Sequence, residues 1–173
     1  MVSINQLHMI MPYASHAKLQ AFGEPLNNAM NKYSINTVLR KTAFIAQIAH
    51  ESGSLNYTKE IASGKAYEGR KDLGNTVDGY GVKYKGRGLI QITGFFNYKE
   101  AGKALGVDLV NHPDLLEGAE FASMSAAWWW SSHGLNELAD QEKFSAITKV
   151  INGGYNGIGD REGFYKRAKK IIK

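Results

Sequence analysis

Apolar side chains recur at intervals of three and four residues along most of the chain, and this spacing predicts a mainly α-helical protein. The predicted helices cover residues 18–33, 37–52, 95–105, 118–133 and 142–151, followed by a last helix that begins with Asp160. Pro25 indicates a break or restart in the first of them. In the last helix an apolar stripe lies opposite the lysines, so we expect this helix to pack on the body of the protein.

The helix predicted for residues 37–52 differs from the others in the extent of its apolar surface. From Thr42 to Ala49 its residues are apolar or small on nearly every face, which is typical of a helix buried at the centre of a domain. Asn36 is the expected N-cap and Gly53 the expected C-terminal stop. We therefore predict one central buried helix.

Glu51 lies in the last turn of this predicted central helix. Partial burial and the partial negative charge of a helix C-terminus both favour the protonated carboxyl group. A general acid needs this state at neutral pH. The alternative is a glutamate at a helix end that is solvated or paired with a lysine.

Residues 54–94 are polar and rich in glycine, and they predict an irregular lobe with some β structure. The segment from Tyr84 to Thr93 has strand character and predicts one arm of a small β-hairpin. In such a strand Gln91 and Thr93 share one face, where their amide and hydroxyl groups can hold sugar hydroxyls or orient a water molecule. A solvent-facing strand edge is the alternative.

The same irregular region carries Glu60 and Glu68. Glycoside hydrolysis with inversion needs two carboxylates about 6.5–9.5 Å apart, with a water molecule between them. Either glutamate is a candidate to act together with Glu51.

Composition limits the architecture and the chemistry. The chain has 173 residues, 43% of them apolar, which is enough for one well-filled core and too few for two ordinary domains, so we expect a single domain over 1–173. It contains no cysteine, which excludes disulfides, thiolate metal sites and cysteine nucleophiles. We find no apolar run of roughly 20 residues and no signal-peptide pattern, so we expect synthesis in the cytoplasm without a signal peptide.

The net charge of +5 is concentrated at one end of the chain. Residues 161–173 hold six basic residues and one acid, and residues 1–160 hold 15 of each. This distribution is consistent with weak contact between a basic C-terminal helix and an anionic envelope, or with a solvated lysine face. A nucleic-acid binder usually has a wider basic footprint, so no nucleic-acid partner is expected.

Sequence motifs for metals and nucleotides are incomplete. His50 and Glu51 begin a zinc-protease motif, but Ser54 occupies the position of its second histidine. Gly86 and Gly88 begin a dinucleotide-binding motif, but Gln91 replaces its last glycine. We therefore expect no metal and no cofactor, and structural roles for the five histidines.

Several segments, taken together, resemble a known family. They are FIAQIAHESG, AYEGRKDLGN, YKGRGLIQITGFFNY, GVDLVNHPDLL, ITKVINGGYNG and DREGFYKR, and they extend from about Leu26 to the end of the chain. This set resembles the plant-chitinase-like glycoside hydrolases of family nineteen. The compact form without cysteine looks like the phage endolysin branch. The resemblance implies a lysozyme-like, mainly α fold with a cleft between two lobes.

The resemblance also implies catalytic roles. Glu51 would be the general acid, Glu60 would activate water from the opposite face of the sugar, and Thr93 would help to hold that water. Residues 86–88 would be scaffold.

Five further residues match substrate-side positions of the family. Gln91, Asn97 and Tyr98 would bind the sugar. Asn152 and Arg161 would belong to the hydrogen-bond network around the second carboxylate and the substrate.

The resulting hypothesis is an endolysin-type glycosidase that hydrolyses β-1,4 bonds of peptidoglycan glycan strands. We expect it to be a monomer and to reach the wall in the periplasm after holin-type release. The alternatives are a chitinase acting on N-acetylglucosamine polymers, a lytic transglycosylase, and a catalytically inactive sugar-binding module.

Overall fold

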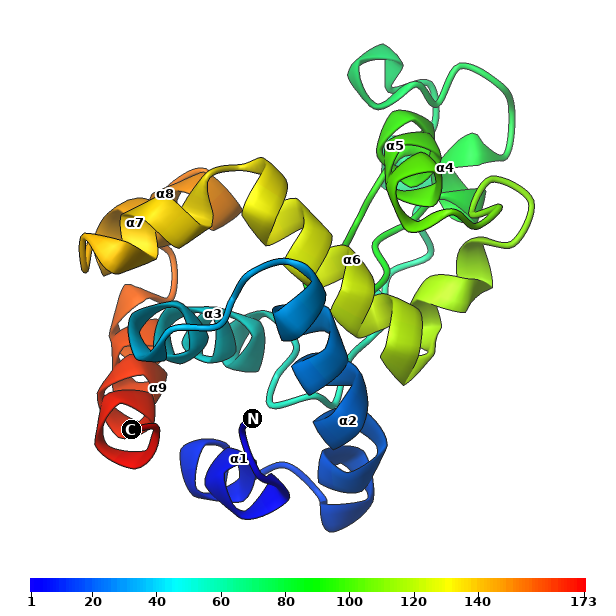
Figure 1. Cartoon of the computed structure of the whole chain (residues 1–173). Helices are drawn as coiled ribbons and strands as arrows, with labels where there is room; N and C mark the ends of the chain where they lie inside the picture. Colours follow the sequence, from blue (N-terminus) through cyan, green and yellow to red (C-terminus); the bar gives the residue numbers. More distant parts are fainter.

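The computed structural model describes all residues from 1 to 173 and is almost entirely helical (Figure 1). Its helices are α1 (Ile4–Ile10), α2 (His16–Lys32), α3 (Val38–Glu51), α4 (Tyr80–Lys83), α5 (Phe95–Leu105), α6 (Ala119–Ser132), α7 (Leu135–Asp140), α8 (Phe144–Asn152) and α9 (Ile158–Ile171). Short 3₁₀ turns are η1 (Lys65–Tyr67), η2 (Lys71–Leu73) and η3 (Pro113–Glu117). The predicted mainly α fold class is confirmed, and no helix is both long and apolar enough to cross a bilayer.

Two separate hydrophobic cores divide the molecule into a large and a small lobe. The large core lies among α1, α2, α3, α6, α7, α8 and α9. The small core, around α4 and α5, contains Tyr84, Ile92, Tyr98, Ala101, Leu109 and Leu116. Helix α6 connects the two lobes (Figure 1). Its Trp130 is buried in the large core, and its Trp128 packs against the small one.

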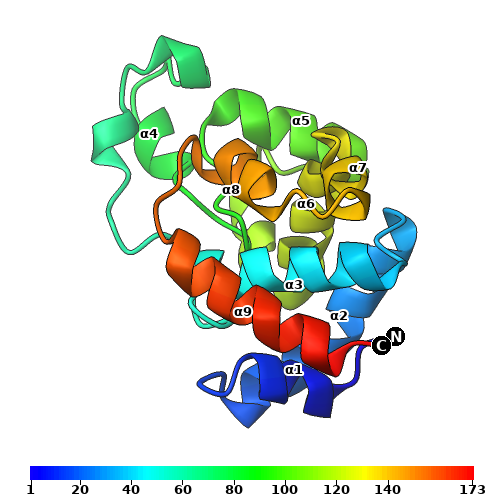
Figure 2. The same ribbon diagram turned by 90° about the vertical axis from the view of Figure 1, so that its left-hand side faces the viewer.

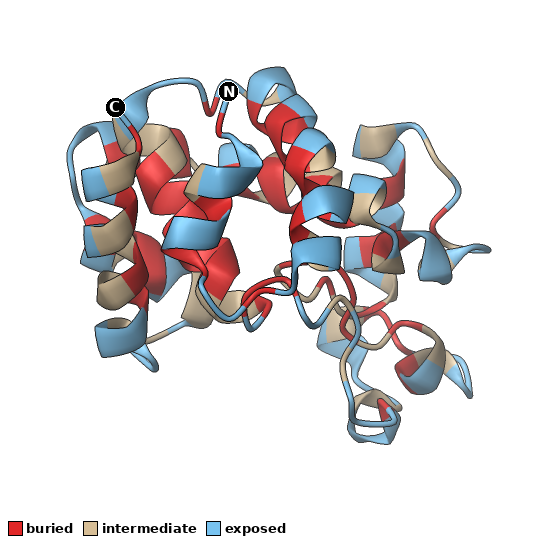
Figure 3. Ribbon diagram, turned by 90° about the horizontal axis from the view of Figure 1, so that it is seen from below, coloured by how far each residue is buried: buried red, intermediate tan, exposed pale blue.

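Helix α3 is the central buried helix that the sequence predicts. Every residue from Thr42 to Ala49 is buried. Helix α9 packs along α3 (Figure 2), and Figure 3 shows that buried residues lie mainly where helices face one another. The helix ends in a Schellman motif, in which the N–H of Gly53 donates to the carbonyl of His50 and the N–H of Ser54 to that of Ala49. This sharp stop, with Gly53 at φ 55°, leaves Glu51 on the last turn.

Several predicted helix boundaries are corrected. Thr37, not Asn36, caps α3, because its hydroxyl accepts the N–H of Arg40. Helix α2 continues through Pro25, and its buried face, which includes Phe22 and Leu26, packs against the large core on both sides of the proline. The last helix begins at Ile158 rather than at Asp160. Helices α1 and α7 are too short to show a clear periodicity, and the pattern did not predict them.

The prediction of a β-strand over residues 84–93 is wrong. Residues 84–93 form only isolated bridges, from Arg87 to Lys59 and to Ile92. Gln91 has φ 57°, which closes a tight turn and excludes a regular strand. The side chains of residues 91–93 nevertheless lie on alternating sides, as expected. Ile92 is buried in the small core, while Gln91 and Thr93 point toward Gly86.

Candidate active site

Glu51 forms an ion pair with the most buried cation of the protein. Its Oε1 accepts a hydrogen bond from Nη2 of Arg161, whose side chain is 2% exposed, whereas that of Glu51 is 20% exposed. Arg161 reaches this position because α9 packs along α3. The carboxylate is thus fixed on one side and open on the other.

A chain of buried polar groups holds Arg161 in turn. Its Nη1 donates to Oε1 of Gln47 at 2.5 Å, and Nε2 of Gln47 donates to the hydroxyl of Thr148 at 2.8 Å. Its Nε donates to the backbone carbonyl of Asn156 at 3.3 Å. The guanidinium is therefore fixed from three sides, which suits a role in positioning Glu51.

This arrangement bears on two expectations. Arg161 was expected beside the second carboxylate and the substrate, but it bonds Glu51 and is almost inaccessible. Glu51 was expected to be partly buried at the helix end, or else solvated or paired with a lysine; it is partly buried, and its partner is the guanidinium of Arg161. The sequence pattern misses this pair because the two residues lie 110 positions apart.

His50 fastens the loop between α8 and α9 to the end of α3. Its Nδ1 lies 2.6 Å from Oδ2 of Asp160, and its ring packs directly on Gly157. These contacts support the structural role expected for this histidine. They also fix the loop that follows Asn152 beside Glu51.

Glu60 has a different environment, with a donor on each oxygen. Its Oε1 accepts from the hydroxyl of Tyr67 at 3.0 Å, and its Oε2 accepts from the backbone N–H of Gly86 at 3.0 Å. Burial and the bond to this carboxylate together raise the pKa of Tyr67. The carboxylate is thus held by two neutral donors, a phenol and a backbone N–H.

Gly86 is the point where the expected catalytic groups of the small lobe meet. A Cβ on Gly86 would lie 2.7 Å from Oε1 of Gln91, 3.2 Å from Oε2 of Glu60 and 3.3 Å from the hydroxyl of Thr93. The structure thus brings Glu60, Gln91 and Thr93 together. Glu68 lies elsewhere, with its carboxylate accepting the N–H of Val82 at 3.2 Å, and this placement favours Glu60 as the second carboxylate.

The structure separates Asn97 from Tyr98. Asn97 is exposed on α5, and its amide donates to the carbonyl of Thr93 at 2.7 Å, so it borders the Gly86 cluster. Tyr98 is fully buried; its hydroxyl donates to the carbonyl of Lys85 at 2.6 Å and accepts from Arg87 at 3.0 Å. Burial raises the pKa of Tyr98 to about 12 despite the nearby guanidinium. These contacts favour a scaffold role over the expected contact with sugar.

Asn152 lies at the end of α8 and has a buried amide nitrogen without a hydrogen-bond partner. An unused donor of this kind is costly unless a ligand or water satisfies it. It is therefore suited to the substrate contact that the resemblance implies.

Sequence reasoning missed Gln47, Thr148 and Tyr67. The signal for Gln47 was available, because it is the polar amide within the apolar run of α3, and such a group needs a buried partner. Tyr67 and Thr148 carried no comparable signal. Only the fold brings them to Glu60 and Gln47.

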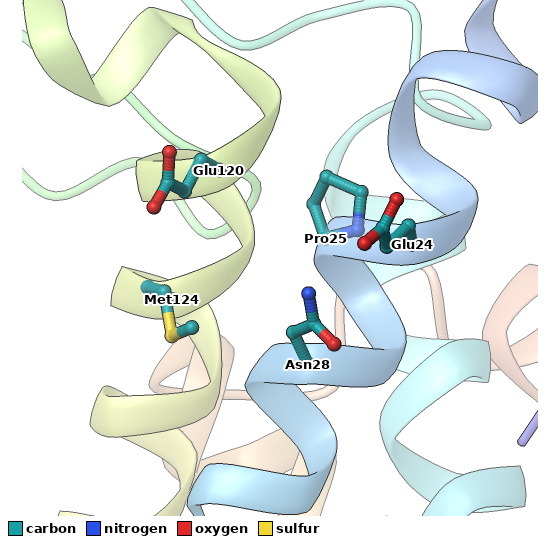
Figure 4. Close-up of a pocket in the computed structure, with 5 residues that line it drawn as sticks. All are labelled: Glu24, Pro25, Asn28, Glu120 and Met124. Carbon is teal, nitrogen blue, oxygen red and sulfur yellow. The ribbon is translucent and has the colours of Figure 1, made fainter.

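Two hollows lie outside these clusters. One, of about 290 Å³, lies between α2 and α6 and is lined by Glu24, Pro25, Asn28, Glu120 and Met124 (Figure 4). The other, of about 210 Å³, lies beside Glu68 and Asp78. Neither of them is lined by Glu51 or Glu60. No three histidine or acidic side chains gather closely enough to hold a metal ion.

Solved structures with the same architecture are chitinases. The chain is similar to a crystal structure of a bacterial family 19 chitinase, with a TM-score of 0.78, 26% identity, and coverage of 99% of this chain and 94% of that one. It is also similar to chitinase C from Streptomyces griseus, with a TM-score of 0.76, 26% identity and coverage of 99% and 76%.

Sequence relatives lead to the same family. A glycosyl hydrolase family 19 domain-containing protein of Haemophilus influenzae is 31% identical over 96% of this chain and 94% of its own length. The basic endochitinase of Vitis vinifera is 38% identical over 54% of this chain, which spans only 38% of that protein. The family profile described as class I chitinase matches residues 34–138. The chain therefore belongs to family 19 of the glycoside hydrolases and is a chitinase-like enzyme of that family.

Proposed function

We propose that this enzyme hydrolyses the β-1,4 bonds between the amino sugars of bacterial peptidoglycan, as an endolysin does. The observation that carries the proposal is the pair of carboxylates in unlike environments, with Glu51 beside Arg161 and Glu60 beside Gly86 and Tyr67. Pairs of carboxylates with different surroundings are the usual source of an acid and a base in glycoside hydrolysis.

In the proposed reaction, Glu51 protonates the oxygen of the leaving sugar. Arg161 holds Oε1 of Glu51 in place for this transfer, while the partly exposed side of the carboxyl group faces the sugar. Glu60 accepts a proton from a water molecule, and that water attacks the anomeric carbon from the opposite face.

The neutral groups around Gly86 orient the attacking water. The hydroxyl of Thr93 donates to the carbonyl of Gln91, and the amide nitrogen of Gln91 donates to the carbonyl of Gly88. Oγ1 of Thr93 and Oε1 of Gln91, which lie close to Gly86 together with Oε2 of Glu60, can therefore both accept a hydrogen bond from a shared water molecule. We assign to Asn97 and Asn152 the binding of the hydroxyl and acetamido groups of the substrate; the unused amide donor of Asn152 supports this assignment.

Site variants test the assignment of the two carboxylates. We expect Glu51→Gln and Glu60→Gln each to lower turnover by at least a hundredfold while the fold is retained, and Glu68→Gln to retain the parental rate. Glu51→Gln should also lower the melting temperature, because it leaves the buried guanidinium of Arg161 without its counter-charge. A Glu51→Gln enzyme that lyses cells at the parental rate would show that the acid is assigned wrongly, and a fully active Glu60→Gln would do the same for the base.

Chitin is the second candidate substrate, because three of the four named relatives are described as chitinases or endochitinases. Turbidity loss of cells stripped of their outer membrane, compared with release from soluble chitin oligomers, distinguishes the two. Mass spectrometry of the released muropeptides distinguishes hydrolysis, which leaves reducing ends, from lytic transglycosylation, which leaves anhydro-sugars.

The proposed route to the wall is release from the cytoplasm through a holin-type pore. It predicts that lysis of an expressing cell requires a membrane-permeabilising protein. Lysis by expression of this chain alone, without membrane damage, would argue against this route.

A further inference from the structure

Helices α1 and α9 lie side by side on the large lobe and are fastened to each other (Figure 2). The amide of Gln6 donates to the carbonyl of Ile171 at 3.1 Å, and Nε of Arg167 donates to the carbonyl of Ile10 at 3.0 Å. The outward sides of these two helices therefore form one continuous surface, which we call the α1/α9 surface.

The α9 part of this surface is cationic. Phe164 and Ala168 face the core, so the exposed residues Lys166, Lys170 and Lys173 lie on the solvent side. None of these three lysines forms an ion pair, whereas Lys169, on the flank, is paired with Glu142. Glu162 is the one acid beyond Asp160 on α9, and it lies toward the end of the helix that carries Arg161.

The α1 part adds exposed apolar side chains and no negative charge. Residues 1–23 contain no aspartate or glutamate. Met9 on α1 is 45% exposed, and Tyr13, in the turn that follows α1 and is included in this surface, is 86% exposed. The surface thus combines unpaired lysines with apolar groups that have no partner in this chain.

We propose that the α1/α9 surface docks this protein on a lipid bilayer that contains anionic phospholipids. Lysines attract anionic headgroups, and exposed Met and Tyr side chains enter the boundary between headgroups and acyl chains. A soluble polyanion would use the lysines but would gain nothing from Met9 and Tyr13. Lys170 lies on the order of 15 Å along α9 from Arg161, so a docked molecule keeps its candidate active site free.

The first test is co-sedimentation of the full chain with vesicles of phosphatidylethanolamine and phosphatidylglycerol, compared with phosphatidylcholine vesicles. We expect binding to the anionic vesicles only. The triple variant Lys166→Gln, Lys170→Gln, Lys173→Gln should bind on the order of a hundredfold more weakly, since each lysine near an anionic surface contributes roughly a fivefold factor. The matched control replaces Lys71, Lys99 and Lys103 of the small lobe, which lowers the net charge equally and should leave most of the binding intact.

The second test separates a bilayer from polyanions in general. The double variant Met9→Ser, Tyr13→Ser keeps every charge, and it should weaken vesicle binding about tenfold while leaving retention on immobilised heparin unchanged. Equal binding to both vesicle types, or equal loss in both lysine triples, would overturn the proposal. Unchanged vesicle binding of the double variant would overturn it as well, in favour of a general polyanion surface. Thermal unfolding by circular dichroism checks that each variant is folded, and none of these readouts depends on the proposed reaction.

Discussion

The absence of a side chain at Gly86 leaves space next to the carboxylate of Glu60. Its Cα lies among the polar ends of Glu60, Gln91 and Thr93, and its N–H holds Oε2 of Glu60. Any larger residue would occupy the space where the proposed mechanism needs a water molecule.

We therefore predict that Gly86→Ala lowers turnover at least tenfold while changing the stability little. The new Cβ would lie 2.7 Å from Oε1 of Gln91 and 3.2 Å from Oε2 of Glu60, and these are flexible side-chain ends that can move away. Kinetics and thermal unfolding measure the two effects. Gly159→Ala is the control, because nothing lies within 4 Å of its added Cβ. Parental turnover in Gly86→Ala would contradict the proposed position of the water.

Arg87 stabilises the small lobe through Glu117. Its Nε donates to Oε1 of Glu117 at 2.8 Å, and the ammonium of Lys59 lies 3.1 Å from the same oxygen. Burial alone would raise the pKa of Glu117, but the bonds from Arg87 and Lys59 lower it below its ordinary 4.5.

Because the folded state lowers the pKa of Glu117, this carboxylate contributes stability that is present above pH 4.5 and is lost as the pH falls through the lowered value. We expect Glu117→Gln to reduce the free energy of unfolding by about 1 kcal/mol at pH 7 and by much less at pH 3. Urea unfolding at both pH values measures this difference. An equal loss at both would show that the ion pair adds no stability.

Among the connecting elements, the loop between α8 and α9 is fixed most directly to the candidate site. Gly157 begins α9 with φ 71°, and the ring of His50 lies against its Cα. The next turn of the same helix supplies Asp160 to His50 and Arg161 to Glu51.

Gly157→Ala should therefore displace this loop and lower both activity and melting temperature. The added Cβ would lie 2.3 Å from Cε1 of His50, in a left-handed conformation that already disfavours a side chain by about 1 kcal/mol. Gly153→Ala carries the same conformational strain at φ 72° but meets no atom within 4 Å, so it isolates the steric part. Identical melting temperatures and rates for the two variants would refute the role given to the His50 contact.

At the scale of the whole molecule, the two hydrophobic cores differ in size. Thirty buried residues form the large core and six form the small one, and residues 54–83 between them are mostly exposed turns. The Glu60 cluster therefore lies on the less strongly packed lobe, while Glu51 and Arg161 lie on the more strongly packed one.

Native-state hydrogen exchange should report this difference. We expect amides in the small lobe to exchange through openings of lower free energy than amides in α3, since opening free energy follows the amount of buried apolar contact. Exchange of both lobes with one common opening free energy would indicate a single cooperative unit instead.

The sequence alone determined the features that depend on neighbours along the chain. Helical spacing located α3, α5, α6 and α8 within a few residues, the apolar run from Thr42 to Ala49 identified α3 as the buried helix, and Gly53 marked its end. Motif resemblance identified the family that the comparisons confirmed. Propensity failed where packing overrides it, as at Pro25 within α2 and in the turn at Gln91.

The tertiary structure alone decided which side chains meet. The bond from Arg161 to Glu51, the donors that Tyr67 and Gly86 give to Glu60, and the burial of Tyr98 all depend on elements that are distant in sequence or folded irregularly. Periodicity shows which face of a helix is apolar. It does not show which other helix covers that face, or at which position along the helix axis the two helices meet. Only the packing of α9 on α3 fixes these quantities, and with them the surroundings of Glu51.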